Sequence, residues 1–124
     1  MNILIASATL ESFGDYSIIG DPQTADELYD CVYSDDGINV VKVTLDRAAF
    51  DAAFETANDD FAAGQVRFDR NKLLAESDIA MLPDRYNAMS EEDKAAWTTY
   101  RQALRDITTQ EGFPHSVTYP QKPE

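Results

Sequence analysis

Apolar side chains return at helical spacing in two long stretches of the chain, and this feature constrains the fold most strongly. The first set lies at i, i+4, i+7 and i+11 and comprises Phe50, Phe54, Ala57 and Phe61. The second set lies at i, i+3, i+7 and i+10 and comprises Trp97, Tyr100, Leu104 and Ile107. A period of 3.6 residues places each set on one face of an α-helix. We therefore expect two amphipathic helices that each bury one face.

Short β-rich runs precede the first of these helices. Residues 31–33 and 38–43 flank Ser34-Asp35-Asp36-Gly37, and an Asp-Gly pair between such runs is a strong hairpin signal. Two further apolar runs, Ile3–Ile5 and Ser17–Ile19, are predicted to form short strands. The N-terminal half should therefore contain a small sheet.

A change in charge accompanies the end of the first amphipathic helix, which we expect at Gly64 because glycine is the common C-cap residue. Residues 1–66 carry thirteen Asp or Glu against two Lys or Arg, a net charge of −11. Residues 67–124 carry ten against eight, a net charge of −2. We therefore predict an acidic α+β region at 1–66, a helical module at 67–120 and an unstructured tail at 121–124.

Helix signals and breaks alternate in the second half. Arg67–Glu76 is predicted to form a short helix that Ser77-Asp78 interrupts. Pro83 should then prevent a helix and leave a turn-rich segment, because proline lacks the backbone donor. Ser90 has the character of an N-cap for the second amphipathic helix. Gly112-Phe113-Pro114 is expected to stop that helix and leave the following residues extended.

Length and composition indicate a folded globular protein. The 124 residues suffice for one domain or two very small ones, and the 44% hydrophobic fraction is too high for a disordered acidic chain. We predict an α+β fold, with a small, mostly antiparallel sheet and one helix in the N-terminal half, then a helical C-terminal module. The net charge of −13 disfavours nucleic acid and anionic membrane surfaces as partners. No apolar run reaches about 18 residues, so we expect no membrane span.

Residues capable of catalysis or metal binding are sparse. Cys31 and His115 are the single cysteine and histidine, which leaves no cluster of soft or imidazole metal ligands. Cys31 lies in a β-rich run, where a small buried hydrophobe is the usual role. His115 has no evident partner that would orient it as a catalytic base. We therefore expect no enzyme activity, no cofactor and no metal site.

Three separated blocks of the C-terminal half agree in residue type, order and spacing with one known family. The agreeing positions are Arg70, Leu73-Leu74, Ser77-Asp78, Leu82-Pro83-Asp84, Lys94-Ala95-Ala96-Trp97, Tyr100-Arg101-Gln102-Ala103-Leu104-Arg105-Asp106, Gly112-Phe113-Pro114 and Pro120. The segment 67–120 therefore resembles the phage tail assembly chaperone-like domain of tailed-bacteriophage proteins. Ile79 and Tyr119 depart from the family pattern, since both positions commonly hold Trp.

The resemblance implies a role in assembling a phage tail and implies no chemistry. We expect a non-enzymatic tail morphogenesis protein that acts in the host cytoplasm and binds other phage tail proteins. The alternative is a virion-resident minor structural protein of the tail fibre, tail tip or tube, and capsid decoration is a further alternative. A homo-oligomer or an assembly within the virion stays open.

The candidate partner-binding residues lie on or near the second amphipathic helix. They are Trp97, Tyr100, Leu104, Phe113 and Tyr119. A helix in so small a domain must bury one face, so the stripe is more often core than docking surface. Part of it could instead stay open for a partner, because exposed apolar patches often mark binding sites.

Overall fold

The computed structural model describes residues 1–124 and confirms an α+β fold. The chain forms two compact units, each with most of its residue contacts inside itself: an N-terminal unit, Met1–Phe61, and a C-terminal unit, Ala62–Glu124. That these units behave as separate domains, with a boundary after residue 66, stays a prediction. The elements in chain order are α1 (Ile3–Glu11), β1 (Ser17–Ile18), α2 (Ala25–Asp30), β2 (Val32–Asp35), β3 (Val40–Lys42), α3 (Arg47–Ser77), η1 (Asp78–Met81), α4 (Pro83–Asn87), α5 (Glu91–Arg105) and η2 (Asp106–Thr109), where η denotes a 3-10 helix.

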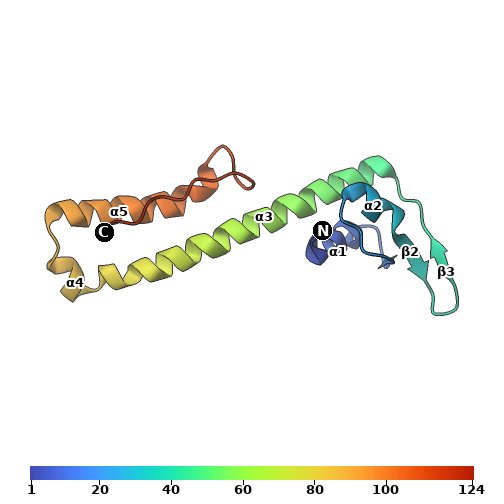
Figure 1. Ribbon diagram of the computed structural model, residues 1–124, viewed down its shortest axis with the longest axis horizontal. Coiled ribbons are helices and arrows are strands. Elements are labelled where there is room, and N and C mark those ends of the chain that lie inside the picture. Colours follow the sequence, from blue (N-terminus) through green and yellow to red (C-terminus); the bar gives the residue numbers. More distant parts are fainter. The chain divides into compact units, whose positions relative to one another are not determined.

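The sheet of the N-terminal unit has three antiparallel strands in the order β1-β2-β3. Figure 1 shows β2 and β3 as a hairpin. The predicted Asp-Gly hairpin between β2 and β3 is confirmed. Gly37 adopts φ of +83°, the left-handed region that glycine enters without steric cost. Asp36 Oδ1 accepts bonds from the N–H groups of Ile38 at 2.9 Å and Asn39 at 2.7 Å. These donors, with Asn39 the larger cause, lower the pKa of the Asp36 carboxyl.

The predicted strand at Ile3–Ile5 is wrong, because these residues begin helix α1. Asn2 caps the helix: its side-chain oxygen accepts from Leu4 N–H at 2.8 Å. The apolar run alone could not decide between strand and helix, since both bury short apolar segments. The deciding pattern extends further, with a buried face comprising Ile5, Ala6, Thr9 and Leu10.

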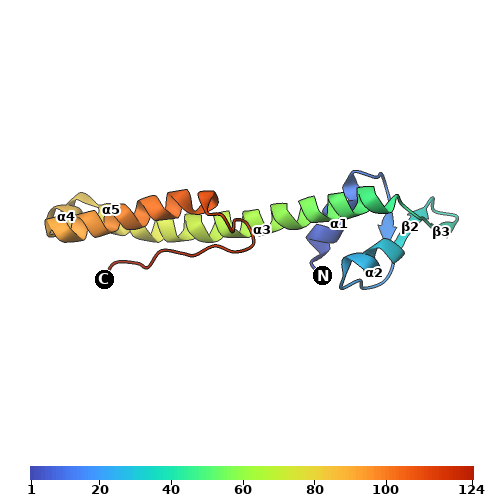
Figure 2. The same cartoon turned by 90° about the horizontal axis from the view of Figure 1, so that it is seen from above.

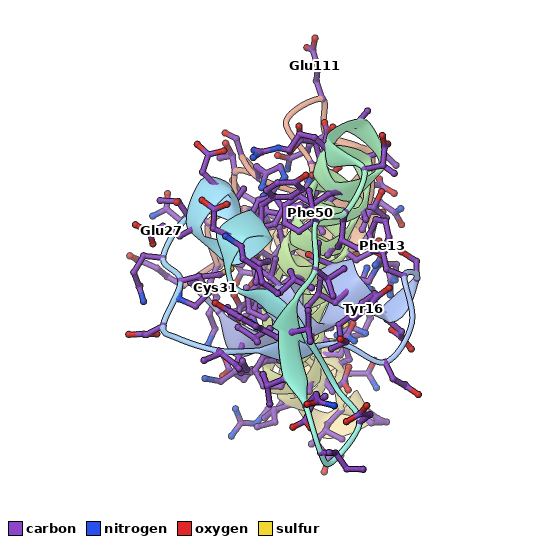
Figure 3. All side chains as sticks on the ribbon, turned by 90° about the vertical axis from the view of Figure 1, so that its right-hand side faces the viewer. Phe13, Tyr16, Glu27, Cys31, Phe50 and Glu111 are labelled. Atoms are coloured by element: carbon purple, nitrogen blue, oxygen red, sulfur yellow. The ribbon has the colours of Figure 1, made fainter.

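Phe50 lies at the centre of the N-terminal unit and is fully buried (Figure 3). Its ring meets Tyr29 edge-on at 5.2 Å and stacks on Phe54 at 6.5 Å between centroids. The other buried members of this core are Ala6, Leu10, Leu28, Val32 and Leu45. The first apolar set is helical, as predicted; Phe50 and Ala57 are buried, and Phe54 and Phe61 are partly buried.

Helix α3 does not end at Gly64, contrary to the sequence-based expectation, and continues to Ser77. Gly64 lacks the positive φ that a glycine C-cap requires, and its neighbours Ala63 and Gln65 are good helix formers. Arg67–Glu76, expected as a separate short helix, forms the last turns of α3. The expected break at Ser77-Asp78 is confirmed, since η1 begins there.

The C-terminal unit is a helical hairpin in which α5 runs antiparallel to the last turns of α3 (Figures 1 and 2). Ser90 caps α5 by accepting a bond from Asp93 N–H at 3.1 Å, as predicted. The residues after η2 turn back along the hairpin towards α4 (Figures 1 and 2). This unit therefore consists of three chain segments side by side: the end of α3, α5 and the non-helical residues after η2.

Two expectations about the hairpin ends need correction. Pro83 does not prevent a helix: it occupies the first turn of α4, where the missing N–H would have had no helical partner. The α-helical part of α5 ends at Arg105, before Gly112-Phe113-Pro114, and Ile107 lies in the 3-10 turn η2. Residues 121–124 carry no helix or strand.

Candidate functional site: the helical hairpin of the C-terminal unit

Three of the five candidate residues hold the hairpin together. Trp97, Tyr100 and Leu104 are all buried, and the indole of Trp97 meets the Tyr100 ring edge-on at 5.8 Å between centroids. Ala80 of η1 completes this buried cluster. The partly buried residues packed against it are Leu73, Leu74, Met81 and Met89. The stripe is therefore intramolecular core, and whether its members also contact a partner stays a prediction.

Arg101 ties α5 to the end of α3, a role that sequence inspection missed. Its Nη1 donates to Asp78 Oδ1 at 2.8 Å, to the carbonyl of Leu74 at 3.2 Å and to the hydroxyl of Ser77. The Ser77 hydroxyl itself donates to the Leu74 carbonyl at 2.7 Å. A cation at a helix C-terminus satisfies carbonyls that have no helical partner and opposes the helix dipole. The arginine of the Tyr-Arg-Gln block thus binds both residues of the Ser-Asp break.

Phe113 and Tyr119 belong to the segment that runs back along the hairpin. Phe113 is half-buried, and the Arg67 guanidinium lies 5.6 Å above its ring. Tyr119 is 37% exposed and borders a shallow groove on α3 with Asp69, Leu73 and Glu76 among its lining. Burial, and secondarily the charge of Asp69, raises the pKa of the Tyr119 phenol. These two candidates are the ones that keep accessible ring surface.

Side-chain and backbone contacts fix the path of this returning segment. Gln110 donates through Nε2 to the Thr118 carbonyl and accepts through Oε1 from the Thr118 N–H, each at 2.8 Å. At Gly112, a Cβ atom would lie 2.1 Å from the carbonyl oxygen of Ser116, a distance that no side chain tolerates. The Gly-Phe-Pro block therefore requires glycine for a close backbone approach and not for ending α5.

A pair of exposed apolar side chains marks the turn of the hairpin. Ile79 and Leu82 are each 53% exposed. Leu82 is the C-cap residue of η1, and its N–H donates to the Ile79 carbonyl at 3.3 Å. Ala80 and Met81, between them, face the core. The exposure of Ile79 could not be predicted from the sequence, because a short 3-10 turn has no periodic signal.

Residues that could bind a metal ion or act in catalysis do not form a cluster. No group of three or more His, Cys, Asp or Glu is placed to hold a metal ion. Cys31 is half-buried beside Gly20, whose hypothetical Cβ would lie 3.3 Å from Sγ. No helix is both long and apolar enough to cross a membrane.

The C-terminal unit is thus a helical hairpin with a buried aromatic core and two half-exposed apolar residues at its turn. A family described as phage tail assembly chaperone protein matches residues 63–124. The chain therefore belongs to this family, which confirms the resemblance, and the matched residues coincide with the C-terminal unit, Ala62–Glu124. Comparisons with curated proteins and with solved structures give no match.

Proposed function

We propose that this protein is a non-enzymatic tail morphogenesis factor that binds another phage tail protein through the turn of its C-terminal hairpin. The bound surface is centred on Ile79 and Leu82 and covers an apolar segment of the partner until the tail assembles. Tyr119 and Phe113 are further partly accessible aromatic residues of the same unit. Trp97, Tyr100 and Leu104 contribute by keeping the hairpin rigid.

The observation that carries the proposal is the exposed pair within the family-matched unit. Burying a side chain such as Ile or Leu is worth about 1.5–3 kcal/mol, so two such residues left half in water are a cost to the isolated protein. Contact with a partner recovers that free energy. Family membership supplies the kind of partner, a protein of the phage tail.

The acidic N-terminal unit has a supporting role in this proposal. Its net charge of −11 over residues 1–66 keeps a complex with an apolar tail component soluble, because like charges on separate complexes repel each other. The site of action is the host cytoplasm during assembly.

Affinity capture from infected cells tests the proposal. Wild-type protein should co-purify with a tail protein, and Ile79→Asp combined with Leu82→Asp should abolish that capture while the far-ultraviolet circular dichroism is unchanged. Thr99→Asp is the matched control, because Thr99 is an exposed polar residue on α5 of the same unit. Unchanged capture by the double variant would overturn the assignment of the surface.

Mass spectrometry of purified virions separates a transient chaperone from a resident protein. The proposal predicts that particles with complete tails lack this chain. Stoichiometric presence in such particles would instead establish the alternative, a minor structural protein of the tail.

A further inference from the structure

The free edge of the small sheet carries exposed apolar side chains that the hairpin turn of the C-terminal unit does not explain. Strand β3 pairs only with β2, and its residues are exposed on both faces. Val40 and Val41 are exposed, and Ile38 in the adjoining turn is 89% exposed. Natural proteins usually blunt such an edge, because an unpaired β-branched strand is a template for another chain.

The backbone register shows which polar groups of β3 are available. The Val43 N–H donates to Val32 O at 2.9 Å, and the Asp36 N–H donates to Asn39 O at 3.3 Å. In an antiparallel pair, residues facing the partner strand alternate with residues facing away. Residues 39, 41 and 43 therefore face β2, and the N–H and C=O groups of Val40 and Lys42 point outwards from the sheet.

This edge is held in place before any partner arrives. Asp35 Oδ1 accepts a bond from Gly37 N–H at 2.8 Å, and the Asp36 carboxylate accepts two further turn donors. An edge fixed by its own turn loses little conformational freedom on pairing with an added strand. The geometry thus suits strand addition, in which main-chain bonds supply affinity and alternate side chains supply specificity.

Charge determines the kind of chain that fits. Residues 1–61 contain thirteen Asp or Glu against two Lys or Arg. Both cations are engaged already: Lys42 Nζ lies 3.8 Å from Asp30, and Arg47 binds Asp26 and Asp51. A second copy of this unit would bring the same excess of negative charge to the edge and be repelled, whereas a basic segment would be attracted.

We propose that β3 accepts an extended, cationic segment of another protein as a fourth, edge-added strand, pairing with the outward N–H and C=O groups of Val40 and Lys42. Apolar residues of that segment pack beside Val41 on one face of the sheet, and its alternating Lys or Arg side chains lie on the other face, which Val40 shares with Asp35. This surface is independent of the Ile79 and Leu82 pair. Figure 3 shows the hairpin that carries it projecting away from Phe50.

Nuclear magnetic resonance with short synthetic peptides tests the proposal on the full chain. A peptide of alternating lysine and valine should slow amide exchange at Val40 and Lys42, while Val41 and Val43, already facing β2, change less. Alternating glutamate and valine should have no effect. The response to alternating lysine and serine should be weaker, because charge without apolar contact is screened by salt.

Substitutions at one outward position sharpen the test. Val40→Pro removes an outward N–H that β2 does not use, so the fold should persist while affinity for the lysine-valine peptide falls by about threefold to tenfold, the worth of one hydrogen bond. Val40→Thr keeps the N–H and the β-branched shape and should bind as wild type. Should Val40→Pro unfold the hairpin, Val40→Lys supplies the test, because a cation at the edge repels the peptide.

Three outcomes would overturn the proposal. Equal responses to the lysine-valine and lysine-serine peptides would mean non-specific attraction to the acidic surface. Protection of Val40 and Lys42 that rises with protein concentration without peptide would mean a second copy as the occupant. Absence of any change at these two amides would mean that the edge does not accept a strand. The Ile79→Asp, Leu82→Asp variant should bind the peptide normally, which separates this inference from the proposed function.

Discussion

Arg101 and Asp78 face each other across the helical hairpin, with Nη1 and Oδ1 2.8 Å apart, and the same guanidinium nitrogen bonds to the last turn of α3. The Arg101 side chain is largely shielded from water, whereas Asp78 is largely exposed. The bond to the Leu74 carbonyl and Ser77 hydroxyl therefore matters more than the ion pair, which solvent screens. One side chain closes the end of α3 and fixes α5 against it.

Replacing Arg101 with Ala should lower the free energy of unfolding by about 1.5–3 kcal/mol, because hydrogen bonds to a charged group are lost and the buried Ser77 hydroxyl loses a donor. Arg105→Ala, on the exposed side of the same helix, should change it by less than about 0.5 kcal/mol. Urea denaturation followed by the fluorescence of Trp97, the single tryptophan, reports on this unit. Equal effects of the two substitutions would contradict the role given to Arg101.

Trp97→Ala should destabilise the hairpin by about 3–5 kcal/mol, the usual cost of removing a large buried aromatic side chain. Phe68→Ala should lie within about 0.5 kcal/mol of wild type, since Phe68 is mainly exposed. Circular dichroism during urea denaturation measures both. Near-wild-type stability of Trp97→Ala together with lost partner capture would show that the stripe is a docking surface after all.

Gly64→Ala should stabilise the protein by about 0.8–1 kcal/mol, because Gly64 is helical, its Cβ position is open and alanine is the better helix former. Gly37→Ala should destabilise instead, since a side chain is strained at φ of +83°. Thermal unfolding of the two variants beside wild type measures both effects. A loss of stability in Gly64→Ala would show that α3 is interrupted at this position.

Alkaline pH should weaken the C-terminal unit through Tyr100. Burial, and secondarily the charge of Glu76, raises the pKa of its phenol, so the folded state favours the neutral form. The resulting stability is present below the unfolded pKa of about 10 and is lost as pH rises through the folded pKa. Tyr100→Phe should flatten this part of the pH dependence of unfolding. An unchanged slope in that variant would remove Tyr100 as the cause.

The sequence was most informative where one helix face had to be buried. Both apolar sets predicted a helix, and the Asp-Gly pair predicted the hairpin, because these signals arise from local geometry. The predicted helix end at Gly64 was wrong because a glycine can end a helix or be tolerated inside one, and neighbours such as Ala63 decide the outcome. The predicted strand at Ile3–Ile5 was wrong because a three-residue apolar run is too short to show the period that distinguishes a helix from a strand.

The candidate site was less accessible to sequence reasoning. Arg101 reaches Leu74 over 27 residues, a separation that no local pattern encodes. The exposure of Ile79 and Leu82 is evident only from the fold, which turns Ala80 and Met81 between them towards the core. Trp97 and Tyr100 lie on the apolar stripe of α5, a feature that in small domains is more often core than docking surface, and both are buried in the hairpin core.

Site-specific photo-crosslinking from position 79 during infection tests the central claim most directly. With a photoreactive amino acid in place of Ile79, the account predicts a covalent adduct to a phage tail protein, identified by mass spectrometry. The same amino acid at Arg105, exposed on α5, serves as the control and should give no such adduct. A tail-protein adduct from both positions, or from neither, would contradict binding through the hairpin turn.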